Sequence, residues 1–128
     1  MKIIISIPAY NEEKTIPNVI KEIKKVMSSE KYNYELIVLN DGSTDNTAKV
    51  CKALGVNVYS NVHNLGLAEA FRNEIKIFLG KKADIMIHTD ADGQYPSEDI
   101  PRLIKEIENG YDLVLGSRFQ FKNKNMPL

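Results

Sequence analysis

Residues 3–7 read Ile3-Ile4-Ile5-Ser6-Ile7, and this run decides the fold class. Its apolar residues are β-branched and continuous rather than alternating, which is the pattern of a strand buried on both faces of a sheet. Apolar runs at 35–39, 84–88 and 112–115 repeat the pattern, and 56–59 is a weaker run. We therefore predict five strands at these positions.

Helical patterns fill the segments between these runs. One lies over 44–54, with Ser43 or Thr44 as its expected N-cap. Three others show apolar residues at helical spacing, and Asn109-Gly110 predicts the end of the last one. The apolar positions that mark these three helices are Ile16, Val19, Ile20 and Ile23; Leu67, Phe71, Ile75 and Phe78; and Ile100, Leu103, Ile104 and Ile107.

Strands that alternate with helices in this order predict an α/β fold, with a mostly parallel sheet and helices on both faces in three layers. The length of 128 residues fits one domain and leaves no room for a second. Because the polar stretch at 122–125 leads to no terminal helix, we expect residues 1–128 to be a part of a domain that is truncated at its C-terminus.

The composition narrows the functional classes. The 17 basic residues balance 17 acidic ones, so the sequence lacks the basic excess expected of a nucleic-acid-binding protein. Cys51 is the only cysteine, which excludes an internal disulfide and a zinc cluster. The apolar stretch at the N-terminus is too short for a signal sequence or a membrane span. We expect a cytoplasmic domain, which in a longer form could lie at the cytoplasmic face of a membrane.

Polar motifs follow the predicted strands directly. Ligands bind at the carboxyl ends of strands in open parallel sheets, because loops converge there and helix N-termini attract anions. The first motif is Pro8-Ala9-Tyr10-Asn11-Glu12-Glu13, in which Tyr10 could lie against a base or a sugar and Glu12 could accept a hydrogen bond from a hydroxyl. The same residues also fit a plain loop into a helix, with Asn11 as the cap.

The second motif, Asn40-Asp41-Gly42-Ser43-Thr44-Asp45, follows the run at 35–39. Gly42 permits a tight turn and the three residues after it can cap the next helix, which leaves Asp41 without such an explanation. A carboxylate at this point suits recognition of an N–H donor on a nucleobase. Further along, Gly66 could let backbone amides approach a pyrophosphate, although a glycine near a helix start is a weak signal.

The strongest local signal is Thr89-Asp90-Ala91-Asp92-Gly93-Gln94, which follows the run at 84–88. Mg²⁺ typically takes one or two protein carboxylates together with substrate phosphates. Asp90 and Asp92 therefore predict a divalent metal, Mg²⁺ or Mn²⁺, that neutralises a diphosphate leaving group. After the last apolar run, Arg118 offers a planar charged group suited to phosphate, or to an ion pair with one of the aspartates.

Taken in order, these motifs resemble those of family 2 glycosyltransferases of the GT-A fold, whose nucleotide-binding half is Rossmann-like. The resemblance is closest to the branch of dolichol-phosphate mannose synthase and polyprenyl-phosphate glycosyltransferases, and it runs from Met1 to about Phe119. The motifs that carry it are Pro8–Glu13, Asn40–Asp45, Asn64–Ala68, Asp90–Gln94 and Gly116–Phe119.

The resemblance implies a role for individual residues. Asp41 matches the residue that reads the base, and Arg118 matches an arginine near the acceptor phosphate. Asn40 departs from the pattern, since many members carry an aspartate there. The implied nucleotide-binding residues are Pro8, Ala9, Tyr10, Glu12, Asp41, Gly66, Asp90 and Ala91; the implied metal ligands are Asp90, Asp92 and Gln94; the implied catalytic residues are Asp92 and Arg118.

The resemblance also implies the reaction. It is an inverting, metal-dependent transfer of a sugar from a UDP- or GDP-sugar to a polyprenyl or dolichyl phosphate, or to a glycan hydroxyl. The acceptor-binding half of the family is missing here, so a module that binds a nucleotide or self-associates without catalysis stays an alternative. A nucleotidyltransferase is disfavoured, because residues 8–13 lack the glycine- and arginine-rich phosphate loop of that class.

Overall fold

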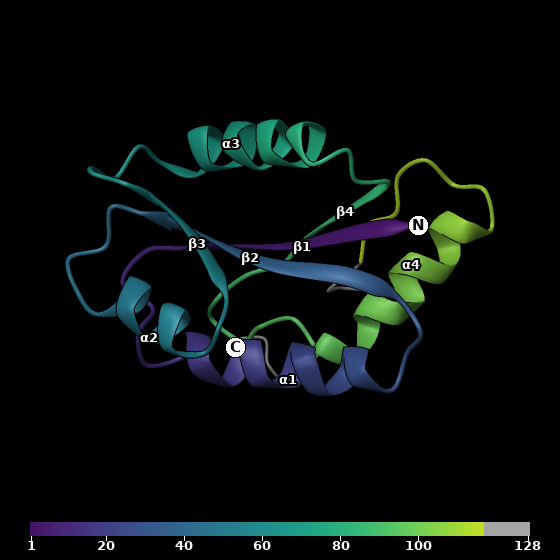
Figure 1. Ribbon diagram of the computed structural model, residues 1–128, viewed down its shortest axis with the longest axis horizontal. Helices are drawn as coiled ribbons and strands as arrows, with labels where there is room; N and C mark the ends of the chain where they lie inside the picture. The colour runs from purple at the N-terminus through teal and green to yellow at the C-terminus, as the bar shows by residue number, and fades with distance from the viewer. Residues whose placement is uncertain (117–128) are drawn as a thin grey trace.

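The computed structural model describes residues 1–116. Strands and helices alternate along them, with one short 3-10 turn before the last helix (Figure 1). The elements are β1 Lys2–Ala9, α1 Ile16–Ser28, β2 Asn33–Asp41, α2 Thr47–Ala53, β3 Asn57–Asn61, α3 Leu67–Gly80, β4 Ile85–His88, η1 Ser97–Asp99 and α4 Ile100–Glu108.

The four strands form a parallel sheet in the order β3-β2-β1-β4. β1 is central, since it pairs with β2 over its whole length and with β4 over residues 3–6. Figure 1 shows α3 over one face of the sheet and α1, α2 and α4 on the other side. The predicted α/β class, with a parallel sheet between helices, is therefore confirmed. No helix in the described part of the chain has the length and apolar character to cross a membrane.

Strand β1 contributes side chains to both layers, as its continuous apolar run predicts. Ile3, Ile5 and Ile7 pack with the buried side of α1, where Ile20 and Ile23 are fully buried. Burying an isoleucine side chain contributes roughly 1.5–3 kcal/mol, and most of the buried apolar residues belong to this layer. The alternate residues of β1 point to α3, because successive side chains of a strand face opposite sides.

Two predicted elements need correction. The second helix begins at Thr47 rather than at residue 44. The amides of Thr44 and Asp45 instead donate to the side-chain oxygen of Asn11, so the turn before the helix is tied to the first loop. Asn11 therefore braces two loops and does not cap α1, whose N-cap is Thr15.

The run at 112–115 is not a strand in the structure. A strand exists only where its backbone finds a partner, and this segment pairs with none of the four strands within residues 1–116. Its residues Leu113 and Leu115 are exposed. The strand predicted at 112–115 from apolar character alone is therefore wrong.

The third helix forms as predicted, but it turns a different side to the sheet. Its buried residues are Ala70 and Glu74, whereas Leu67, Phe71 and Ile75 are exposed. The helical period was right and the assumed buried side was wrong, because a charged residue occupies the inward position. Glu74 is tolerated there through a specific partner that is described below.

Gly42 is required by its surroundings as well as by its conformation. Its φ of +71° lies in the left-handed region, and a Cβ would come within 2.4 Å of the carbonyl carbon of His63. Gly55 has a similar φ of +76°, but a Cβ there would meet nothing within 4 Å. Only at Gly42 does close backbone packing add to the cost of the left-handed conformation.

We predict that Gly42→Ala lowers the free energy of unfolding by more than Gly55→Ala does. The matched control carries only the conformational cost, about 1–2 kcal/mol, whereas Gly42→Ala must also move the backbone at 63–64. Urea unfolding of both variants gives the comparison. Equal destabilisation would show that the two loops do not pack as closely as the structure has them.

Candidate functional site

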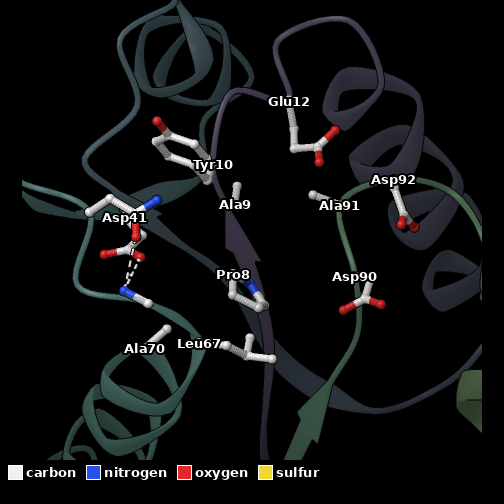
Figure 2. Close-up of a pocket in the computed structure, with 12 residues that line it drawn as sticks. Pro8, Ala9, Tyr10, Glu12, Asp41, Leu67, Ala70, Asp90, Ala91 and Asp92 are labelled. Carbon is white, nitrogen blue, oxygen red and sulfur yellow. Dashed lines mark hydrogen bonds between the residues drawn. The ribbon is translucent and has the colours of Figure 1, made fainter.

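A cavity of about 350 Å³ opens at the carboxyl edge of the sheet. In Figure 2, Asp41 and Ala70 lie on one side, Asp90 and Asp92 on the other, and Pro8, Ala9 and Leu67 between them. Its position follows from the strand order, since the crevice of an open parallel sheet lies where neighbouring connections leave in opposite directions. The lining residues are Pro8, Ala9, Tyr10, Glu12, Asp41, Asn64, Gly66, Leu67, Ala70, Asp90, Ala91 and Asp92.

Asp41 ends β2 and holds the loop before α3. Its Oδ1 accepts hydrogen bonds from the Asn61 side chain at 3.0 Å and the Leu65 amide at 2.9 Å, and its Oδ2 accepts from the Gly66 amide at 2.9 Å. Only 6% of the residue is exposed. Asp41 therefore has a structural role that the sequence motif did not reveal.

The ionised form of Asp41 is favoured by these donors. Burial alone would raise the pKa of its carboxyl, but the hydrogen bonds from Leu65, Asn61 and Gly66 outweigh burial and leave the pKa below its ordinary value. A carboxylate has about four acceptor positions, and three are used here. Within residues 1–116, one position is left without such a hydrogen bond.

Gly66 stands at the start of α3 with a φ of +90°, a conformation that favours glycine. Its own amide is already committed, to Asp41 and to the side chain of Asn64. The next amides belong to the first turn of α3, where N–H groups have no partner within the helix and the helix dipole is positive. An anion in the cavity would therefore meet donors from the first turn of α3, not the Gly66 amide.

Asp90 and Asp92 face the opposite side of the cavity (Figure 2). Among residues 1–116, no group of three or more His, Cys, Asp or Glu side chains is arranged to hold a metal ion. The two carboxylates therefore fit a divalent cation only as part of a ligand set that substrate oxygens and water complete. Mg²⁺ and its analogues bind in this way beside phosphates.

Two further predicted site residues, Gln94 and Arg118, are not placed at the cavity by the described residues. Gln94 is not among the lining residues, and its amide donates to Asp92 Oδ1 at 3.0 Å. Arg118 lies outside the described residues. Both assignments stay predictions.

The first loop is fixed from two directions. Thr15 places its hydroxyl 2.9 Å from the Glu12 carboxylate and 2.9 Å from the carbonyl oxygen of Ala91, so it joins the loop after β1 to the loop after β4. The Glu12 amide donates to the Thr47 hydroxyl at 3.0 Å. Tyr10 remains exposed at the rim, where its ring could meet a planar ligand.

A contact between His88 and the buried Glu74, beside the cavity, was not predicted. His88 Nδ1 lies 2.7 Å and 3.0 Å from the two carboxylate oxygens of Glu74, and His88 Nε2 lies 4.0 Å from Asp90 Oδ1. The hydrogen bond with Glu74, opposed by burial and aided by the charges of Glu74 and Asp90, raises the pKa of His88 above its ordinary value.

All eight residues predicted to bind the nucleotide line the cavity, as does Asp92. The structure adds Asn64, Leu67 and Ala70 to the lining. Asn64 and Leu67 belong to the motif Asn64–Ala68, although no role was assigned to them, and Ala70 could have been found only from the position of α3. The role of Glu74 could not have been found without knowing which side of α3 faces the sheet, because its partner His88 lies 14 residues further along the chain.

Comparison with known proteins gives a consistent result. Residues 4–127 match the family described as "Glycosyl transferase family 2". An uncharacterised protein of Methanocaldococcus jannaschii is 41% identical over 99% of this chain and 51% of its own length. A dolichol-phosphate mannosyltransferase of Pyrococcus furiosus is 34% identical over 93% of this chain and 34% of its own length.

A solved structure shares the fold. Glucosyl-3-phosphoglycerate synthase from Mycobacterium tuberculosis, in complex with Mn²⁺, uridine diphosphate and glucosyl-3-phosphoglycerate, superposes with a TM-score of 0.67 and 31% identity. The match covers 83% of this chain and 39% of that one. The chain thus spans about half the length, or less, of the proteins it matches.

We predict that Asp41→Asn destabilises the protein in a pH-dependent manner. Because the folded-state pKa of Asp41 is lowered, its stabilisation is present above the unfolded pKa of about 3.9 and is lost as the pH falls through the folded value. Urea unfolding should show the variant weaker by about 1–3 kcal/mol at neutral pH, with the gap closing below pH ~4. Asp112→Asn, at an exposed loop position, is the control. A gap that is independent of pH would contradict the assignment.

Proposed function

The chain belongs to glycosyl transferase family 2, and on that premise we propose that its cavity binds the nucleotide and diphosphate of a nucleotide-sugar donor. The observation that carries the proposal is the lining of the cavity. Three loops bring polar groups to the cavity. These groups are the buried carboxylate of Asp41, the start of α3, and the carboxylates of Asp90 and Asp92. Residues 1–128 would then be the donor-binding part of a longer glycosyltransferase domain.

The nucleoside end would lie toward Asp41 and Tyr10. The remaining acceptor position of Asp41 can take an N–H of a base, and the exposed ring of Tyr10 can cover the base or the ribose. Because Asp41 also holds the Leu65 and Gly66 amides, base recognition and the position of the α3 start would be linked through one side chain. Glu12, whose carboxylate accepts a hydrogen bond from the Thr15 hydroxyl, would also accept one from a ribose hydroxyl.

The diphosphate would lie between the start of α3 and the two aspartates. The helix start supplies donors and a positive dipole to one side of it. Asp90 and Asp92 would hold Mg²⁺ or Mn²⁺ together with the phosphate oxygens, with Gln94 as a further ligand, and the cation would neutralise charge on the leaving group. The solved relative that contains Mn²⁺ and uridine diphosphate supports this choice.

For the acceptor we propose a polyprenyl or dolichyl phosphate, supported by the dolichol-phosphate mannosyltransferase relative. One phosphate oxygen of the lipid would form the new bond to the anomeric carbon as the bond from that carbon to the donor diphosphate breaks, with inversion. The products are a glycosyl phosphate lipid and a nucleoside diphosphate. No proton need be removed, because a phosphate monoester is already largely dianionic above pH ~6.

In this mechanism the chain positions charges rather than moving protons. An anionic nucleophile and an anionic leaving group repel each other, so charge balance and alignment are the main requirements. Arg118, which matches an arginine near the acceptor phosphate, would balance the nucleophile. A lipid acceptor would place the reaction at a membrane surface.

We predict that this chain binds one nucleoside diphosphate in a metal-dependent manner. Calorimetric titration of UDP and of GDP, each with and without Mn²⁺, should give heat for one nucleotide only when the metal is present. The nucleotide that binds identifies the donor class. If neither binds, or if binding is indifferent to metal, residues 1–128 do not form a donor site as proposed.

We also predict that Asp92→Ala abolishes metal-dependent nucleotide binding and leaves the fold intact. Asp92 is exposed, so removing its carboxylate opens no cavity in the core. Asp112→Ala is the matched control, since that aspartate is also exposed but lies outside the cavity lining. Nucleotide affinity in the presence of Mn²⁺ that is the same for both variants would rule out the metal assignment.

A further inference from the structure

The hydroxyl of Thr15 connects two residues of the cavity lining, although Thr15 itself is not part of that lining. Its Oγ1 lies 2.9 Å from Glu12 Oε2, in the loop after β1, and 2.9 Å from the carbonyl oxygen of Ala91, in the loop after β4. A third and longer contact, 3.5 Å to the Glu12 carbonyl oxygen, stays within the first loop. Glu12 and Ala91 both line the cavity (Figure 2), so Thr15 can act on a ligand through them.

Helix capping does not explain this hydroxyl. Thr15 is the N-cap residue of α1, and a threonine there normally accepts a hydrogen bond from the amide of the second or third helical residue. The second residue is Pro17, which has no N–H, and the Thr15 side chain makes no capping hydrogen bond. Thr15 therefore forgoes a contact worth about 0.5–2 kcal/mol, and its hydroxyl lies between the two loops instead.

The hydroxyl has one proton for two acceptors. A carbonyl oxygen and an ionised carboxylate only accept hydrogen bonds, so Thr15 can donate to Glu12 or to Ala91 but not fully to both. Among residues 1–116, no other residue donates a hydrogen bond to Glu12 Oε2 or to the Ala91 carbonyl oxygen. Because the two distances are equal, a second donor at either oxygen decides where the Thr15 proton goes.

The Ala91 carbonyl belongs to the peptide group that leads into Asp92. The Ala91 side chain is buried in the core, with 3% of the residue exposed. The next carboxylate, that of Asp92, accepts a hydrogen bond from the Gln94 amide at 3.0 Å. Because a peptide group is planar, a hydrogen bond to the Ala91 carbonyl also fixes the direction in which the chain enters Asp92.

We propose that Thr15 is a positioning residue of the donor site, whose hydroxyl links recognition of the nucleoside at Glu12 to the placement of Asp92 at the diphosphate. A ribose hydroxyl that donates to Glu12 leaves the Thr15 proton to the Ala91 carbonyl, and this hydrogen bond fixes the peptide group before Asp92. Binding of the nucleoside end thereby favours binding of the diphosphate end. The inference rests on the proposed function of the cavity.

The test is a double-variant cycle, read out as the affinity for UDP and for GDP in the presence of Mn²⁺. Thr15→Val removes the hydroxyl and keeps the branched shape, and it should weaken binding about tenfold. Thr15→Ser keeps the hydroxyl and should bind as the wild type does. In a Glu12→Ala background, Thr15→Val should weaken binding by about threefold, because the contact with Ala91 alone is then left to lose.

Two results of the cycle would overturn the link between the two ends. If Thr15→Val has no effect in the Glu12→Ala background, Thr15 acts through Glu12 alone. If the effect of Thr15→Val is equally large in both backgrounds, Thr15 acts independently of Glu12. Urea unfolding reports the stability of each variant, and Thr15→Ala replaces Thr15→Val in the same comparison if the valine variant does not fold.

Thr44→Val is the matched control. The Thr44 hydroxyl also joins two loops, through a 3.3 Å contact with Asn11 Oδ1, but Thr44 is exposed and absent from the cavity lining. This variant should leave nucleotide affinity unchanged. A folded Thr15→Val protein that binds as tightly as wild type, while Asp92→Ala does not bind, would overturn the inference and leave the proposed function standing. Wild-type protein that binds neither nucleotide with Mn²⁺ would overturn both.

Discussion

The site depends on the burial of β1 between two parallel neighbours. Because β1 pairs with β2 on one side and β4 on the other, three strand ends reach the same edge of the sheet. Polar residues that a ligand can reach follow such strands at their ends, where the chain leaves the core. The apolar run at 3–7 and the motif at 8–13 are therefore two consequences of a single constraint.

Most of the fold, and most of the residues that line the cavity, could be predicted from the sequence. The reason is the same in each case. Strand ends converge regardless of side-chain detail, so residues such as Pro8, Asp41 and Asp90 were brought together by topology alone. The start of α2 could not be predicted, because it depends on the distant side chain of Asn11. The run at 112–115 was wrongly predicted to be a strand, because a strand needs a partner and this segment pairs with none of the four strands of residues 1–116. A propensity pattern carries no information about those partners.

The roles of individual residues were harder to predict than their positions. Asp41 had the signature of a ligand-binding group, yet much of its hydrogen-bonding capacity is spent on the loop at 61–66. Glu74 had the signature of an exposed helix residue, yet it is buried against His88. In both cases the carboxylate is satisfied by groups that only the folded chain brings near.

The central claim is that a nucleoside diphosphate binds at the carboxyl edge of the sheet, between α3 and the loop after β4. The most direct measurement is a map of backbone amide shifts by nuclear magnetic resonance as Mg²⁺ and UDP or GDP are added to the labelled chain. The account predicts shifts that cluster at Ala9, Asp41, Leu67 and Ala91, from four separate segments. Shifts confined to another part of the sheet, or no shifts with either nucleotide, would contradict it.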